Sequence, residues 1–136
     1  MYEVKADSEV PDIIPKELND DAISRGFDEK DKLFFEACSP RKVNGTYYLI
    51  YSPQKCTCLA YAVSKSPLGP YTYKGVIVDN AGCDPAVWNN HGSVIEYKGK
   101  WYVLYHRATH GCVAMRKACI EEIKFNEDGT IDEVEM

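Results

Sequence analysis

Between residues 33 and 79, short runs of aromatic and β-branched residues alternate with turn-forming residues. Such runs predict strands, because branched and aromatic side chains fit a pleated surface and Gly, Pro and Asn mark the turns. The Asn44-Gly45 dipeptide separates the first two runs and predicts a tight hairpin. None of the runs has helical periodicity. We therefore expect four strands, at 33–39, 46–52, 59–64 and 71–78.

The pattern then repeats. Residues 45–52 align with residues 99–106 at an offset of 54, and flanking apolar runs predict further strands at 90–97, 113–118 and 120–125. An all-β repeat of this length with four strands per unit is typical of a propeller blade. We therefore predict an all-β fold of two four-stranded antiparallel propeller blades. The expected organisation is an acidic lead-in segment at 1–32, blades at 33–79 and 90–135, and a linker loop at 80–89.

Two blades cannot close a ring, because propellers typically contain 4–8 blades. The open flanks are expected to expose sheet faces that carry Tyr47, Tyr48, Trp101 and Tyr102. Apolar faces of that size rarely stay bare in a soluble monomer. Either the chain is part of a larger protein, or copies of it associate.

The net charge of −5 lies in one segment, because residues 1–32 carry ten acids and five bases whereas 33–136 carry eleven of each. Without a basic stripe, nucleic acid is not an expected partner. No apolar run approaches the ~20 residues of a membrane span, so no membrane association is expected. The polar N-terminus lacks a signal peptide, so a cytoplasmic location is expected for the chain as given, with secretion left open if a leader is absent.

The six cysteines do not suggest a disulfide framework. Cys38, Cys58, Cys112 and Cys119 lie within predicted strands, where a free thiol behaves as a small hydrophobe. Cys56 and Cys58 are one residue apart, which does not match the paired spacing of a structural zinc site. We therefore expect reduced thiols.

Seven runs stand out along residues 27–135: Phe35-Glu36-Ala37-Cys38-Ser39, Asn44–Ser52, Ser66–Tyr71, Asn90–Val94, Lys98–Arg107, Met115–Ile120 and Phe125–Ile131. They stand in the same order as in glycoside hydrolase family 43, and the chain resembles the C-terminal half of its α-L-arabinofuranosidase and β-xylosidase members. The resemblance implies two blades of a five-bladed β-propeller.

The resemblance implies inverting hydrolysis of glycosidic bonds in arabinose- and xylose-containing saccharides. Such a site needs two carboxyl groups about 6.5–9.5 Å apart, one acting as acid and one as base. Glu36 matches the family's general acid. His91 matches a histidine associated with a metal ion, usually Ca²⁺, in the propeller channel, although Gly92 stands where a second histidine is common. The repeat offset of 54 maps Glu36 onto Asn90, so Glu36 and His91 are expected near one axis.

Arg116 matches an arginine that reaches the bound sugar, and Arg107 is a weaker candidate for substrate binding. His106, His110 and Asp84 are left without a role. The family's catalytic base belongs to the half that this chain lacks, so a missing N-terminal half or another copy is an expected partner. The alternatives are a catalytically inactive carbohydrate-binding or interaction module, and a truncated fragment that self-associates.

Overall fold

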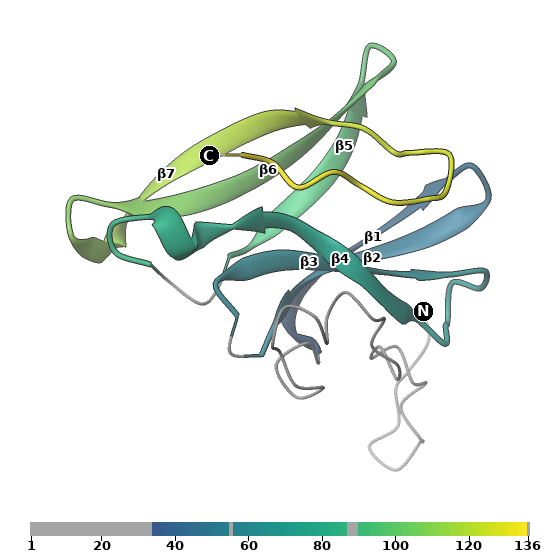
Figure 1. Ribbon diagram of the computed structural model, residues 1–136, viewed down its shortest axis with the longest axis horizontal. Coiled ribbons are helices and arrows are strands. Elements are labelled where there is room, and N and C mark those ends of the chain that lie inside the picture. The colour runs from purple at the N-terminus through teal and green to yellow at the C-terminus, as the bar shows by residue number, and fades with distance from the viewer. Residues whose placement is uncertain (1–33, 55, 87–89, 136) are drawn as a thin grey trace, which may run out of the picture.

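The computed structural model describes residues 34–54, 56–86 and 90–135, where strands dominate (Figure 1). The strands confirm the all-β fold class. The expected lead-in at 1–32 and residues 87–89 of the expected linker lie outside the described residues. No helix in these ranges is long and apolar enough to cross a membrane. The elements are β1 Phe34–Val43, β2 Thr46–Pro53, β3 Cys58–Ser64, β4 Thr72–Asp79, the 3-10 helix η1 Asn80–Gly82, β5 Gly92–Tyr97, β6 Lys100–Thr109 and β7 Cys112–Ile123.

The first four strands form one antiparallel sheet in sequential order. Its first turn is the expected hairpin, with φ of 48° at Asn44 and 80° at Gly45. Positive φ at both central residues gives the turn a twist that matches the flanking strands. The β5–β6 turn repeats this conformation 54 residues later, with φ of 51° at Lys98 and 77° at Gly99. The sequence repeat is therefore also a backbone repeat.

The second sheet contains three strands, in the order β5-β6-β7, where four were predicted. The runs 113–118 and 120–125 were expected to be separate strands. They join instead, because no Gly or Pro interrupts the chain and β7 pairs with β6 from Trp101↔Ile123 to Thr109↔Cys112. Beyond Ile123 the chain makes isolated bridges rather than a fourth strand.

The main core lies between the two sheets. Tyr48, Ile50 and Leu59 of the first sheet pack in one cluster with Val94 and Val103 of the second. Gly92 sits where the sheets come close together, and an added Cβ there would lie 2.5 Å from Leu59 Cδ2 and 2.9 Å from the backbone oxygen of Leu104. The opposite face of the first sheet forms a second buried cluster that includes Leu49, Tyr51, Ala60, Ala62 and Tyr73.

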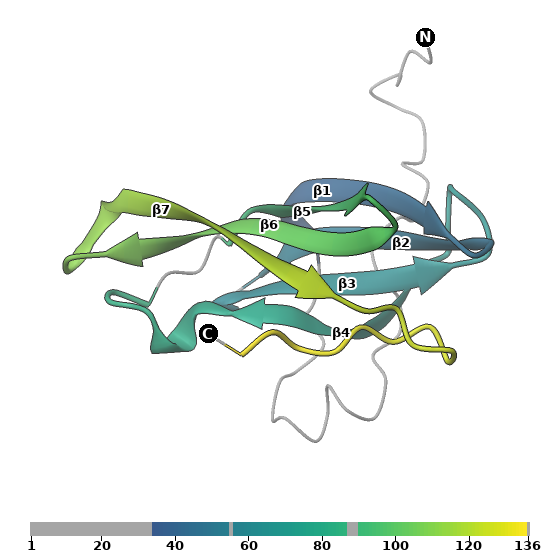
Figure 2. The same cartoon turned by 90° about the horizontal axis from the view of Figure 1, so that it is seen from above.

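The segment after β7 returns along β4 and connects the two sheets (Figure 2). The Val134 amide donates to the Ile77 carbonyl oxygen at 2.8 Å, and the Ile131 amide donates to the Tyr61 hydroxyl oxygen at 2.9 Å. The Tyr48 hydroxyl donates to the Gly129 carbonyl oxygen at 3.0 Å. These bonds anchor a segment that has little regular structure of its own.

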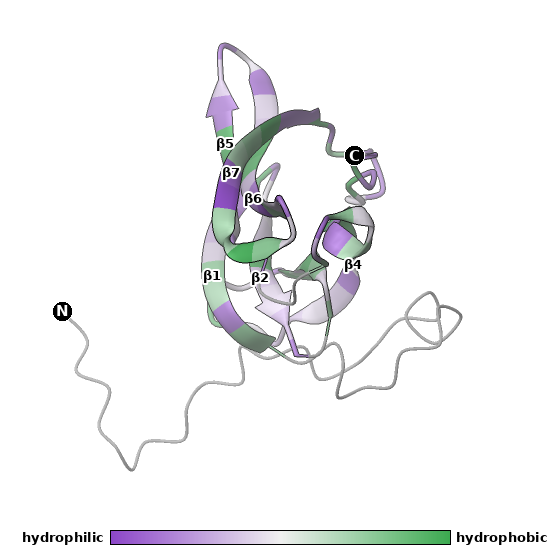
Figure 3. Ribbon diagram, turned by 90° about the vertical axis from the view of Figure 1, so that its left-hand side faces the viewer, coloured by the Kyte–Doolittle hydropathy of each residue, from purple (hydrophilic) through white to green (hydrophobic). Residues whose placement is uncertain are grey.

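The exposed apolar surface differs from the predicted one. Tyr48 is only 2% exposed, because it lies in the core between the sheets. The most exposed large apolar side chains of the second sheet include Val113, Met115 and Ile120 on β7, which carries hydrophobic and hydrophilic residues along its length (Figure 3). In the described part of the chain, β7 is an edge strand with no partner on its outer side.

The expectation of reduced thiols throughout is wrong for one pair. Cys56 and Cys58 form a disulfide, with an S–S distance of 2.04 Å and a Cα–Cα distance of 5.2 Å. The turn before β3 brings the two Cα atoms within bridging range despite the single intervening residue. Cys38 is exposed rather than buried, and Cys112 and Cys119 are partly exposed free thiols.

Candidate active site

Glu36 lies in an irregular part of β1. The pairing with β2 shifts register on both sides of it, between Phe34 and Glu36 and again between Glu36 and Ser39. Ala37 has a φ of 60°, in the left-handed region that alanine rarely adopts. Bulges of this kind change the direction of a side chain and are frequent beside active sites. The backbone at Ala37 therefore sets the direction of the Glu36 carboxyl group.

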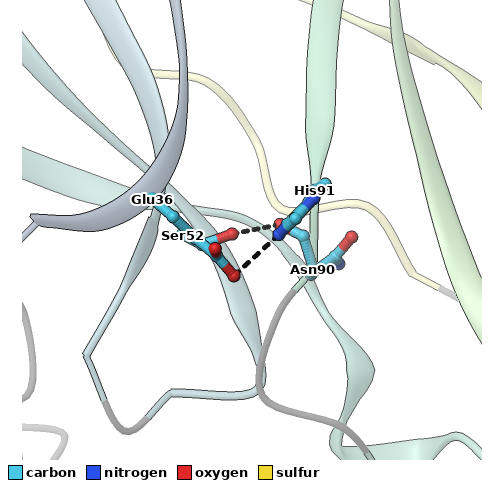
Figure 4. Close-up of polar contacts among 4 residues, drawn as sticks. All are labelled: Glu36, Ser52, Asn90 and His91. Atoms are coloured by element: carbon cyan, nitrogen blue, oxygen red, sulfur yellow. Dashed lines mark hydrogen bonds and ion pairs between the residues drawn. The ribbon is translucent and has the colours of Figure 1, made fainter. Parts of the chain in front are cut away.

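The Glu36 carboxyl group meets the His91 imidazole across the junction of the two sheets (Figure 4). Glu36 Oε1 lies 2.8 Å from His91 Nε2, and the side chains are 37% and 42% exposed. A protonated imidazole makes this contact an ion pair, and a neutral imidazole with its hydrogen on Nε2 donates to the carboxylate. The two residues expected near one axis thus lie in contact, whereas their chemical roles stay predictions.

Ser52 and Asn90 hold the backbone next to this pair. Ser52 is the β2 partner of Glu36, and its hydroxyl donates to the Asn90 carbonyl oxygen at 2.6 Å with both residues fully buried (Figure 4). This bond fixes the chain one residue before His91. The sequence pattern indicates no role for either residue; the available signal was a serine near the end of a largely apolar strand.

A second set of contacts ties β1 to β5. The Arg41 guanidinium donates to the Val94 carbonyl oxygen at 2.5 Å and to the Ser93 hydroxyl at 2.9 Å. The Ser39 and Ser93 hydroxyls, 54 residues apart in the sequence, lie 2.9 Å from each other. Because these contacts follow Glu36 and His91 by a few residues on each strand, they fix the spacing of the two strands that carry the pair.

His106 also belongs to the site. Its ring centroid lies 5.7 Å from that of His91 in an edge-to-face arrangement. Its backbone oxygen accepts a hydrogen bond from the Asn80 side chain at 3.2 Å. The sequence left His106 without a role, and the register Gly92↔Tyr105 explains its position, because the next residue of β6 lies beside His91.

The two arginines do not join the pair. Within the described residues neither Arg107 nor Arg116 bonds to Glu36 or His91; Arg116 Nε donates to the Val113 carbonyl oxygen at 3.2 Å. Arg107 is exposed and lines a cavity of about 310 Å³ with Cys83 and other residues. Burial raises the pKa of the Cys83 thiol, and the Arg107 charge opposes that shift. Substrate binding by either arginine stays a prediction.

In the described ranges the contact of the Glu36 carboxyl group is with His91, and no hydrogen bond or ion pair joins it to a second carboxyl group. Asp79 accepts bonds from the Thr57 hydroxyl and the Ala81 amide. Hydrogen bonds from Thr130 lower the pKa of Asp128, which lies in the turn before that residue. Asp84 is exposed in the cavity that Arg107 lines. The acids of residues 1–32 lie outside the described part.

The described residues by themselves do not fit a calcium site. Ca²⁺ takes six to eight oxygen ligands. In the described ranges no group of three or more His, Cys, Asp or Glu residues is placed to hold a metal ion. Near His91 the described carboxyl ligand is that of Glu36, which already contacts the imidazole. The association of Ca²⁺ with His91 therefore stays a prediction, and no chemical step is derived from it.

Comparison with known proteins places the chain in a family. The sequence model of glycosyl hydrolases family 43 matches residues 11–131. A xylosidase/arabinosidase of Thermoclostridium stercorarium is 44% identical over 137 residues, which cover 91% of this chain and 28% of that protein. A beta-xylosidase of Xylanibacter ruminicola is 39% identical over 104 residues, covering 74% of this chain and 31% of that protein. The chain thus spans less than a third of either relative.

Solved structures agree with the sequence relatives. A GH43 beta-xylosidase/alpha-arabinofuranosidase from a compost microbial metagenome, in complex with xylotriose in a calcium-free form, has a TM-score of 0.70 and 40% identity, over 78% of this chain and 32% of that one. The GH43_1 enzyme of Xanthomonas citri in complex with xylotriose has a TM-score of 0.69 and 31% identity, over 79% and 32%. The two sheets correspond to part of the β-propeller of these enzymes. The chain belongs to glycosyl hydrolases family 43.

Proposed function

We propose that this chain is the acid-bearing part of an inverting glycosidase that cleaves xylosyl or arabinofuranosyl bonds. In this proposal the Glu36 carboxyl group protonates the oxygen of the leaving group. The observation that carries it is the 2.8 Å contact between Glu36 Oε1 and His91 Nε2, which holds a partly exposed carboxyl group at the junction of the two sheets. The sugar class is supported by relatives named xylosidase/arabinosidase and by neighbours that bind xylose and xylotriose.

The contact suits an acid that changes charge during the reaction. After Glu36 gives up its proton, the carboxylate is stabilised by a hydrogen bond from His91 Nε2. The partly exposed position leaves the carboxyl group open to a sugar. The base that activates water must stand about 6.5–9.5 Å away. We assign it to a part of the full-length enzyme that corresponds to the two-thirds of the relatives lying beyond this chain.

A chimera tests the role of Glu36. This chain replaces the matched 28% of the Thermoclostridium stercorarium relative, and hydrolysis of xylo-oligosaccharides and aryl arabinofuranosides is measured. Glu36→Gln should lower kcat on xylo-oligosaccharides by about 10²–10⁴-fold, the range for loss of general acid–base assistance. Glu121→Gln, an exposed acid on β7, is the matched control and should leave kcat unchanged. A folded chimera in which Glu36→Gln keeps full activity contradicts the assignment.

The isolated chain is expected to hydrolyse the same substrates negligibly, because in this proposal the base belongs to the part of the enzyme that lies beyond it. Hydrolysis by the chain alone that is abolished by Glu36→Gln would mean that a base is supplied in trans by a second copy. A base from a second copy is distinguished from activity of a single copy by the rate of hydrolysis, which would then rise with the square of the chain concentration.

A second candidate is an inactive carbohydrate-binding module. The observation that favours it is that, in the described residues, no contact joins Glu36 to a second carboxyl group. Calorimetry with arabinose, xylose and xylo-oligosaccharides separates the two functions. Binding that Glu36→Gln leaves unchanged, together with an inactive chimera, supports the module and not the glycosidase.

A further inference from the structure

A groove of about 680 Å³ opens at the end of the two sheets that lies away from Glu36. It is bounded by the β1–β2 turn, the β5–β6 turn and the chain that leaves β7. The β1–β2 turn and the loop after β7 lie at the right of Figure 1. Glu36 pairs with Ser52, at the other end of β1 from the turn where Val43 pairs with Thr46. The groove is therefore separate from the Glu36–His91 pair. Its volume lies within the range of small-molecule sites, about 300–1,000 Å³.

Aromatic side chains stand at the inner wall of the groove. Trp101 is partly exposed and packs edge-to-face against Phe125, with ring centroids 5.1 Å apart. Phe125 packs in the same way against the buried Tyr48, at 4.8 Å. This chain of contacts holds the Trp101 ring in a fixed orientation. A fixed indole that stays partly open offers an apolar surface to the C–H face of a ring-shaped ligand with little loss of rotamer freedom.

The rim of the groove is densely charged but electrically balanced. Three ammonium groups stand beside three carboxylates, and Lys100 Nζ lies 2.7 Å from Glu122 Oε2. Equal numbers of both charges favour neither an anion nor a cation. They supply both N–H donors and carboxylate acceptors, which suits hydroxyl groups that both donate and accept. The rim residues are Lys42, Lys100, Lys124, Glu96, Glu122 and Glu127.

From this lining we propose that the groove is a second saccharide-binding site, which takes a neutral oligosaccharide of pentoses with one ring against Trp101. The charge balance and the indole point to a neutral polyol, and the choice of pentose rests on the proposed function. A polysaccharide held here and at Glu36 is bound at two points. The second binding event is then intramolecular, which raises the overall affinity for the polymer without a new contact at the reacting bond.

The test is a titration of the ¹⁵N-labelled chain with xylotriose, followed by NMR. The Trp101 indole N–H and the amides of Gly99 and Lys100 should shift together in a saturable manner. Trp101→Ala should weaken the affinity reported by Gly99 and Lys100 about tenfold, which corresponds to ~1.4 kcal/mol. Tyr97→Ala is the matched control, because Tyr97 is a 58% exposed aromatic residue on the same hairpin that does not line the groove. It should leave the affinity unchanged.

The titration is repeated in the Glu36→Gln chain, so that failure of this site and failure of the proposed function can be told apart. Groove shifts that persist in Glu36→Gln support the second site whatever the chimera shows. If Trp101→Ala does not fold, the test rests on the unmodified chain, in which saturable shifts of the Trp101 indole N–H and of the Gly99 and Lys100 amides support the site and their absence overturns it. A response confined to residues near His91, no response to xylotriose, or a groove response to inorganic phosphate instead of the sugar overturns the proposal.

Discussion

At the scale of single residues, the candidate site depends on one backbone conformation that the sequence does not reveal. Ala37 has a φ of 60°, and it lies between the two register shifts that surround Glu36. A left-handed conformation costs an L-residue about 1–2 kcal/mol. An alanine in the sequence does not indicate a positive φ, whereas the Asn44-Gly45 dipeptide at the hairpin does. The strain therefore lies directly beside the carboxyl group that carries the proposed chemistry.

Ala37→Gly should raise the free energy of unfolding by about 1 kcal/mol, because glycine adopts positive φ without the Cβ clash. Ala37→Val should lower it, because a β-branched residue at positive φ is an outlier. Urea denaturation measures both changes. Ala114→Gly on β7, an exposed position without positive φ, is the control and should lose about 0.5–1 kcal/mol. A loss of stability in Ala37→Gly equal to that of the control would contradict a left-handed Ala37.

At the scale of elements, turn chemistry decided which predictions held. Asn44-Gly45 predicted the hairpin correctly, because two residues with positive φ need these side chains. The separate strands expected at 113–118 and 120–125 carried no such signal between them, and they form one strand. The Cys56–Cys58 disulfide was missed because spacing alone does not say how a turn folds back. Contacts between the first sheet and the second half of the chain, such as Ser52 with Asn90, depend on packing and had no local signature.

The approach of β5 to β3 should be sensitive to a single methyl group. Gly92→Ala places a Cβ against Leu59 Cδ2 and the Leu104 backbone oxygen, so we expect a loss of about 1–3 kcal/mol of stability, as for other overpacked cores. Gly82→Ala is the matched control, because an added Cβ there meets nothing within 4 Å and its φ is not positive. Thermal and urea unfolding report both variants. Equal stabilities of the two would mean that the sheets do not meet at Gly92.

At the scale of the molecule, the chain is two sheets of a propeller, and it spans less than a third of the relatives described above. Its β7 edge carries Val113, Met115 and Ile120, each more than half exposed. Open strand edges with apolar side chains pair readily with other chains.

The isolated chain should therefore associate through β7 as its concentration rises. Sedimentation velocity over a range of concentrations should show a growing oligomer fraction, and the double variant Met115→Lys, Ile120→Lys should shift it toward monomer. The matched control is Leu68→Lys, because Leu68 is 65% exposed but lies in the loop between β3 and β4. An unmodified chain that stays monomeric throughout contradicts this account of the β7 edge.

The most direct measurement of the central claim compares two leaving groups in the chimera. A general acid matters most for a leaving group that needs a proton, such as a sugar, and little for an activated aryl group such as dinitrophenolate. If Glu36 is the acid, Glu36→Gln should cut kcat on xylo-oligosaccharides by about 10²–10⁴-fold and change kcat on the activated aryl glycoside far less. An equal loss on both substrates would show that Glu36 does not act as the proton donor.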